Sequence, residues 1–163
     1  MRLLRRLTAV AWCLAAGCAS VPRPTVVIDK GIEDHPYQIA SGDRAEYQRQ
    51  IQPAIDEARR TYPAARSKFL AGLPEGSHFF LTVRLLDSAG DSEQLFVLVD
   101  AIRHGTVYGR IWSQVQFVHG YEQGQTIEIA EADLMDWTIL DAAGAEEGNF
   151  VGKLIDRLEN VTH

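Results

Sequence analysis

A change in the spacing of apolar residues is the feature that most constrains this fold. Across residues 45–73, apolar side chains recur every three or four positions, which is the stripe of an amphipathic helix. Its members are Tyr47, Ile51, Ile55, Ala58 and Tyr62. From residue 78 the period becomes two, as in a strand with one buried face. Helix followed by strands predicts an α+β domain rather than alternating βαβ units.

Two prolines divide the helical stretch. A proline costs about 3 kcal/mol inside a helix but is tolerated in the first turn. We therefore predict one helix that starts near Pro53 and a second that starts near Pro63. Gly72 and Pro74 are typical of the end of a helix.

The extended part of the chain predicts an antiparallel meander of about five strands. Turn-rich residues separate the runs, as in successive hairpins. The predicted strands are 78–86, 94–102, 106–112, 125–129 and 137–140. Residues 148–159 have helical spacing, but Gly148 and Gly152 leave a strand open there. The fold expected is thus N-terminal helices packed on the meander, with a C-terminal helix or strand.

The N-terminus predicts export. Residues 1–17 contain a basic head and an apolar run of about ten residues, whereas roughly 20 are needed to span a bilayer as a helix. The run ends in small residues before Cys18 and resembles a bacterial lipobox, in which that cysteine is acylated. The alternative is ordinary secretory cleavage, with Cys18 incidental.

The lipobox implies three regions and a location. We predict a signal peptide at 1–17, a flexible tether rich in proline and glycine at 18–44, and a single domain at 45–163. An edge strand at 26–28 is the alternative for part of the tether. Ala19 after the cysteine, by resemblance to enteric lipoprotein sorting, favours a lipid anchor in the outer membrane, facing the periplasm.

Charge and cysteine content exclude several classes of partner. Loss of residues 1–17 removes three arginines and changes the formal charge from −6 to −9. An acidic surface is poorly matched to nucleic acid or to anionic head groups. Cys13 and Cys18 are the only cysteines, so no disulfide or thiolate metal site is expected in the domain.

Few residues suggest chemistry. The five histidines are scattered, no nucleophile motif is present, and we predict neither a metal nor a cofactor. Asp133 and Asp136, with His104 or His119, could supply acid and base groups, although carboxylates spaced in this way also cap turns.

Exposed aromatic residues are the remaining candidates for binding. Trp112 and Tyr121 lie on or beside the sheet, and such side chains offer large contact areas to partners. Trp137 is predicted to be in the core, Trp112 could equally belong to the core, and the alternative for Tyr121, between two glycines, is that it anchors a loop.

The order of these segments resembles the bacterial YegJ-like family of unknown function. The segments that carry the resemblance are Gly109-Arg110-Ile111, Leu134-Met135-Asp136-Trp137 and Gly148-Asn149-Phe150. It covers roughly residues 45–158 and departs at Trp112-Ser113-Gln114-Val115, where members commonly have Asn-x-Pro. It implies a small α+β domain, in some members a lipoprotein, and supplies no activity.

The function expected is therefore a non-enzymatic lipoprotein domain of the cell envelope that binds a protein or cell-wall partner. One alternative is a cell-wall hydrolase that uses carboxylate and histidine groups. Another is a toxin-neutralising or inhibitory module, because an acidic surface suits a basic target.

Overall fold

A computed structural model describes residues 44–161 and confirms the α+β class. The elements are α1 (Arg44–Ala71), β1 (His78–Leu86), β2 (Ser92–Arg103), β3 (Thr106–Ile111), β4 (Thr126–Ala130), the 3-10 turn η1 (Glu131–Asp133), β5 (Leu134–Leu140), β6 (Glu146–Gly148) and α2 (Phe150–Val161). The predicted signal peptide, Cys18 and all but the last residue of the predicted tether lie outside the described residues.

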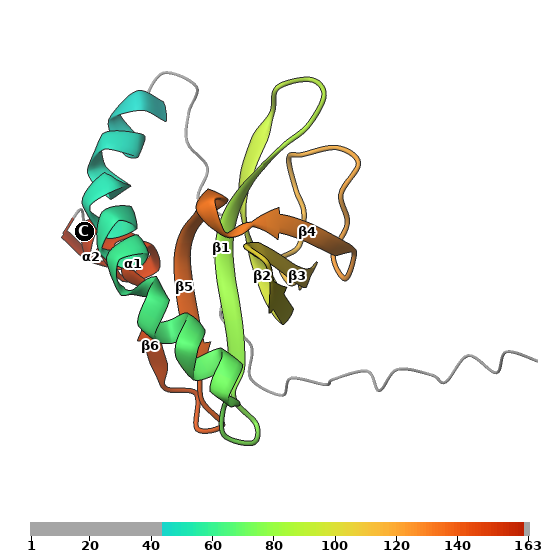
Figure 1. Cartoon of the computed structure of the whole chain (residues 1–163). Coiled ribbons are helices and arrows are strands. Elements are labelled where there is room, and N and C mark those ends of the chain that lie inside the picture. The colour runs from blue at the N-terminus through green and yellow to red at the C-terminus, as the bar shows by residue number, and fades with distance from the viewer. Residues whose placement is uncertain (1–43, 162–163) are drawn as a thin grey trace, which may run out of the picture.

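The strands form one antiparallel sheet of six, in the order β4-β3-β2-β1-β5-β6. The first four strands are sequential neighbours, and β5 returns to pair with the free side of β1 (Figure 1). The meander of about five strands is close to this; the additional strand is β6, which has only three residues. In the middle of the sheet, Phe80 lies opposite Leu98 on β2 and Thr138 on β5.

The two predicted N-terminal helices are one helix, and the predicted breaks at Pro53 and Pro63 are wrong. Both prolines are exposed, so they lie on the side of α1 that faces water rather than the sheet. On the opposite side, a continuous stripe is at most 7% exposed: Tyr47, Ile51, Ile55, Ala58, Tyr62 and Ala65. Packing of this stripe along the whole length of α1 outweighs the cost of two prolines.

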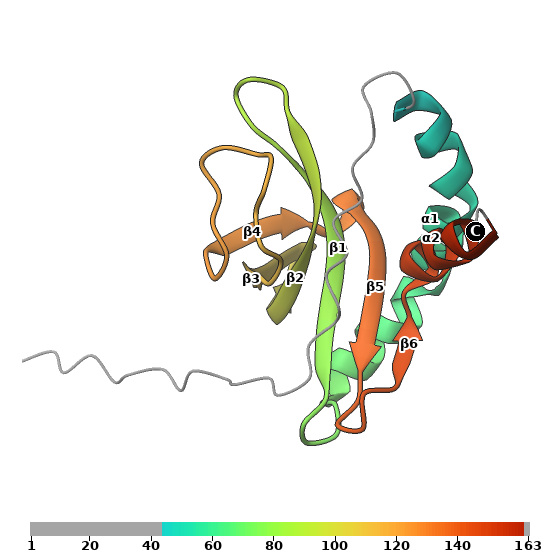
Figure 2. The ribbon, with the colours of Figure 1, turned by 180° about the vertical axis from the view of Figure 1, so that it is seen from behind.

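Both helices lie on the same side of the sheet (Figures 1 and 2). We call this side the first face. The main core forms there, where Ala58 and Tyr62 of α1 pack on Leu81, Val97 and Trp137. A smaller cluster joins Ile51 and Ile55 of α1 to Val151 of α2. The first face is therefore covered as expected for a two-layer α+β domain.

The second face of the sheet carries its own apolar cluster. Phe80, Leu98 and Leu140 are buried there, and Phe96 and Trp112 pack against them. The rings of Phe80 and Trp112 meet edge to face, with centroids 5.7 Å apart.

The C-terminal segment is a helix, α2, which settles the choice between helix and strand. It begins directly after Gly148 and Asn149, both of which have positive φ angles. No helix within residues 44–161 is long and apolar enough to cross a membrane.

Candidate functional site

A cleft of about 490 Å³ lies between the N-terminal half of α1 and the ends of β1, β4 and β5. Its apolar lining comes from Ile55, Val83, Leu85, Ile129 and Met135. These side chains also belong to the packed core or border it, so the floor of the cleft is held in place by the fold itself. Polar and charged side chains from α1, β1, β4 and η1 share the lining, so the cleft offers a ligand both apolar contacts and charged groups.

Two arginines line the cleft from opposite elements. The Nε of Arg59, on α1, donates to the carbonyl oxygen of Leu134 at 3.0 Å. Arg84, on β1, donates to the side-chain oxygen of Gln48. Neither arginine has an ion pair within the described part of the chain, whereas Arg49, Arg60, Arg66, Lys68 and Arg110 each pair with a carboxylate. Two positively charged groups in the cleft therefore form no ion pair with a carboxylate of the described chain.

The turn that closes one end of the cleft is fixed to α1. Glu131 Oε1 accepts hydrogen bonds from Tyr62 Oη at 2.7 Å and from Arg66 Nε at 2.6 Å. Burial first, and then the bond to Glu131, raise the pKa of the Tyr62 hydroxyl. The neutral hydroxyl of Tyr62 therefore helps to hold η1 in place. Because Glu131 is bound to α1, the acidic side chains that line the cleft are those of Glu128 and Asp133.

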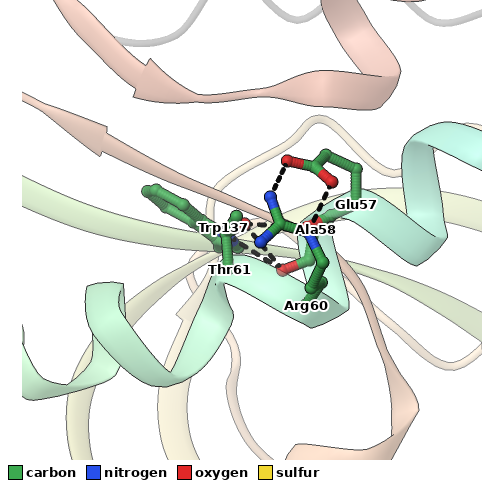
Figure 3. A network of polar contacts seen from close by, with 5 residues as sticks. All are labelled: Glu57, Ala58, Arg60, Thr61 and Trp137. Carbon is green, nitrogen blue, oxygen red and sulfur yellow. Dashed lines mark hydrogen bonds and ion pairs between the residues drawn. The ribbon is translucent and has the colours of Figure 1, made fainter.

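Trp137, on β5, fixes α1 to the sheet through its indole ring. Its indole N–H donates to the carbonyl oxygen of Ala58 and to Thr61 Oγ1, both at 3.0 Å. Figure 3 shows these bonds beside the Arg60–Glu57 ion pair on the same part of α1. Trp137 is 3% exposed, as its predicted place in the core requires.

The candidate catalytic carboxylates have different environments. Asp136 is fully buried, and its two oxygens accept hydrogen bonds from the backbone N–H groups of Trp137 at 2.8 Å and Val151 at 2.6 Å. Burial raises its pKa to about 6. Asp133 is exposed and lines the cleft. Asp136 therefore connects β5 to the first turn of α2, and only Asp133 faces the cleft.

The candidate histidines lie in two separate connections. His104 is exposed in the β2–β3 turn and has a φ angle of 52°. His119 is exposed in the loop between β3 and β4, where its backbone N–H donates to Asp87 Oδ2 at 2.9 Å. This bond lowers the pKa of the Asp87 carboxyl. Neither histidine lines the cleft.

The candidate binding aromatics belong to different clusters. Trp112 is half-buried on the second face, against Phe80. Tyr121 is half-buried against the cluster of Leu95, Ile111 and Val118, and its hydroxyl lies 3.4 Å from the carbonyl oxygen of Leu86. The structure does not gather these two side chains into one patch.

The loop that carries Tyr121 is held by a buried carboxylate. Glu93, on β2, accepts hydrogen bonds from the backbone N–H groups of Gln116, Phe117 and Val118. Sequence alone gave no sign of this role, because Glu93 stands in an otherwise ordinary strand. The loop is therefore a fixed part of the domain surface.

Metal-ligating residues do not gather in the described chain: no group of three His, Cys, Asp or Glu side chains occurs within residues 44–161.

Comparisons with protein-family models, curated proteins and solved structures find no match. The resemblance to the YegJ-like family stays a prediction.

Sequence reasoning missed the two arginines of the cleft. The residues Gln48, Gln52, Ile55 and Arg59 follow one another at intervals of four, three and four, so one stripe of α1 presents all of them. The helical spacing of these residues can be seen in the sequence. Arg84, however, is 25 positions away from Arg59, and only the folded structure places both residues in one cleft.

Proposed function

We propose that this chain is a non-enzymatic lipoprotein domain of the bacterial cell envelope, which binds a protein or cell-wall partner in the α1–sheet cleft. The observation that carries the proposal is the presence of Arg59 and Arg84 over an apolar floor, without a carboxylate partner in the described chain. This pairing of guanidinium groups with apolar surface suits a ligand that is partly apolar and carries an anionic group.

A carboxylate within a peptide fits this site better than a polyanion does. Guanidinium groups bind carboxylates through two parallel hydrogen bonds. Glu128 and Asp133 also line the cleft and would repel a dense run of phosphates. Both envelope proteins and the peptide part of the cell wall carry such carboxylates next to apolar side chains.

Removal of the two guanidinium groups is expected to weaken partner capture. A hydrogen bond to a charged group contributes about 1.5–3 kcal/mol, so the variant with Arg59→Ala and Arg84→Ala should bind at least about 10-fold more weakly. The full-length protein is used as bait in envelope extracts, and the captured partner is then titrated as a purified component. Arg60→Ala is the matched control, because Arg60 neighbours Arg59 on α1 but is paired with Glu57 at the surface.

Equal capture by the double variant and by the Arg60→Ala variant would contradict the cleft as the binding site. Turnover of peptidoglycan or a peptide that depends on Asp133 or a histidine would instead support the hydrolase alternative. Capture of a basic toxin that needs Glu128 and Asp133, but not the arginines, would support the inhibitory module.

Cys18→Ala is expected to move the mature protein from the membrane fraction to the soluble fraction. A single acyl chain binds a bilayer only marginally, so stable anchoring depends on the several chains that a lipoprotein cysteine carries. Membrane fractionation and labelling with a palmitate analogue give the readout, and Cys13→Ala is the control within the predicted signal peptide. A variant that keeps its membrane association would contradict the lipid anchor.

A further inference from the structure

The second face of the sheet is buried more deeply than an open face of a two-layer domain should be. Phe80 is 0% exposed, Thr138 1%, Leu140 4% and Leu98 5%. These side chains alternate along β1, β2 and β5 with those that face the helices. The uncovered face of an antiparallel sheet normally meets water and carries polar side chains.

The described elements place nothing comparable to a helix on this face. Both α1 and α2 lie against the first face, and the two opposite views agree on this (Figures 1 and 2). Within residues 44–161, the second-face cluster consists of strand residues and Trp112, which immediately follows β3. Trp112 packs against Phe80 on β1, but Thr138 and Leu140 are on β5, which lies three strands away from β3 in the sheet.

We propose that the chain's own segment before α1, residues 25–43, docks on the second face of the sheet and covers this apolar cluster. The segment would then be a built part of the domain rather than a free tether. The first reason is that the cluster is already buried in a single chain with no partner present. A face prepared for a second copy or another protein would be exposed in the isolated chain.

The start of α1 favours the same occupant. Tyr47 Oη lies 3.4 Å from Gln94 Oε1, and Gln48 accepts from Arg84. Gln94 and Arg84 are opposite one another in the β1–β2 register, near the end of the sheet where β1 finishes. The first turn of α1 therefore lies against the end of the sheet that carries Arg84 and Gln94.

Length and composition of the segment also suit the face. Residues 29–43 could extend over about 50 Å at 3.3–3.6 Å per residue, more than the roughly 30 Å of the nine-residue β1. The apolar side chains available are Val26, Val27, Ile28, Ile32, Tyr37 and Ile39. Burial lowers the pKa of the His78 imidazole, next to Phe80, which agrees with a covered face.

The test measures access of a maleimide to single cysteines in the full chain. Cys13→Ser and Cys18→Ser remove both native thiols, after which Thr138→Cys reports on the second face. Ala65→Cys is the matched control, because Ala65 is also 1% exposed but belongs to the first-face core. Each reporter is labelled with the segment intact and with Val26, Val27 and Ile28 all replaced by Asp.

We expect slow labelling of Thr138→Cys with the intact segment and labelling at least about 10-fold faster with the altered one, while Ala65→Cys changes less than about twofold. Labelling of Thr138→Cys that is rapid with the intact segment, or unaffected by the three substitutions, would overturn the proposal.

A cross-linking experiment decides the case in which both reporters become accessible because the altered chain unfolds. Val27→Cys is paired with Thr138→Cys, or with Ala65→Cys as control, in the cysteine-free chain, and treated with a flexible bis-maleimide. A cross-link within one chain for the first pair alone supports the docked segment. A covalent dimer would assign the face to a second copy, and no cross-link for the first pair, or equal yields for both pairs, would likewise overturn the proposal.

Discussion

Gly148→Ala is expected to lower the free energy of unfolding by about 3–5 kcal/mol, or to prevent folding. A Cβ at this position would collide with the carbonyl oxygen of Trp137 and lie 2.7 Å from its ring atom Cε3. The backbone can barely retreat, because Gly148 pairs with Thr138 in the sheet and the next residue, Asn149, donates to that same carbonyl at 2.9 Å. Urea unfolding of the purified variant measures the loss.

Gly120→Ala separates this collision from the cost of the backbone conformation. Gly120 has a φ angle of +83° and Gly148 one of +85°, but a Cβ at Gly120 would meet no atom within 4 Å. The control should therefore lose only the conformational cost, about 1 kcal/mol. Similar losses in the two variants would show that contact with Trp137 does not constrain Gly148.

Strong periodicity made the first three strands predictable, and its absence hid the start of β5. Predicted strands 78–86, 94–102 and 106–112 lie close to the observed bounds of β1, β2 and β3. In β5 every residue from Leu134 to Leu140 is buried, so apolar and polar residues do not alternate. The predicted strand therefore began at residue 137 rather than at Leu134, which left Asp136 just outside it, as a candidate acid or turn cap.

Helix length was misjudged for an energetic reason. Local propensity counts each proline as a penalty of about 3 kcal/mol, but it does not count the tertiary contacts of the stripe on the other side of the helix. In α1 that stripe is buried on both sides of Pro63, by Tyr62 and Ala65. Tertiary packing therefore keeps the helix continuous through both prolines, and it ends at Ala71, next to the predicted stop at Gly72.

The candidate site was less predictable than the fold, because its residues come together only through the sheet. Arg84 lies at an exposed position of β1, where a charged residue is common and does not by itself indicate a binding site. Its proximity to Gln48 depends on how α1 crosses the strands. Trp112 and Tyr121 share a stretch of sequence, yet belong to separate apolar clusters.

Asp136→Ala is expected to lower the free energy of unfolding by about 2–3 kcal/mol, whereas Asp133→Ala should change it by no more than about 0.5 kcal/mol. The Asp136 carboxylate accepts from the backbone N–H of Val151 in the first turn of α2, and its removal leaves that donor without a partner. Asp133 is exposed three residues away and is the matched control. Urea or thermal unfolding of both variants measures the difference.

The pH dependence of the unfolding free energy gives a second test of the Asp136 carboxyl group. Burial raises the pKa of Asp136 from 3.8 to about 6, so between these values the folded chain binds more protons at this site than the unfolded chain. The contribution of Asp136 to stability is therefore full below about pH 4, falls as the pH rises toward 6 and is constant above that. Asp136→Asn cannot titrate, so the difference in unfolding free energy between the natural chain and this variant should shrink from pH 4 to pH 6. A difference that stays constant over this range would show that Asp136 is ionised in the fold throughout, in which case the two backbone N–H groups outweigh its burial.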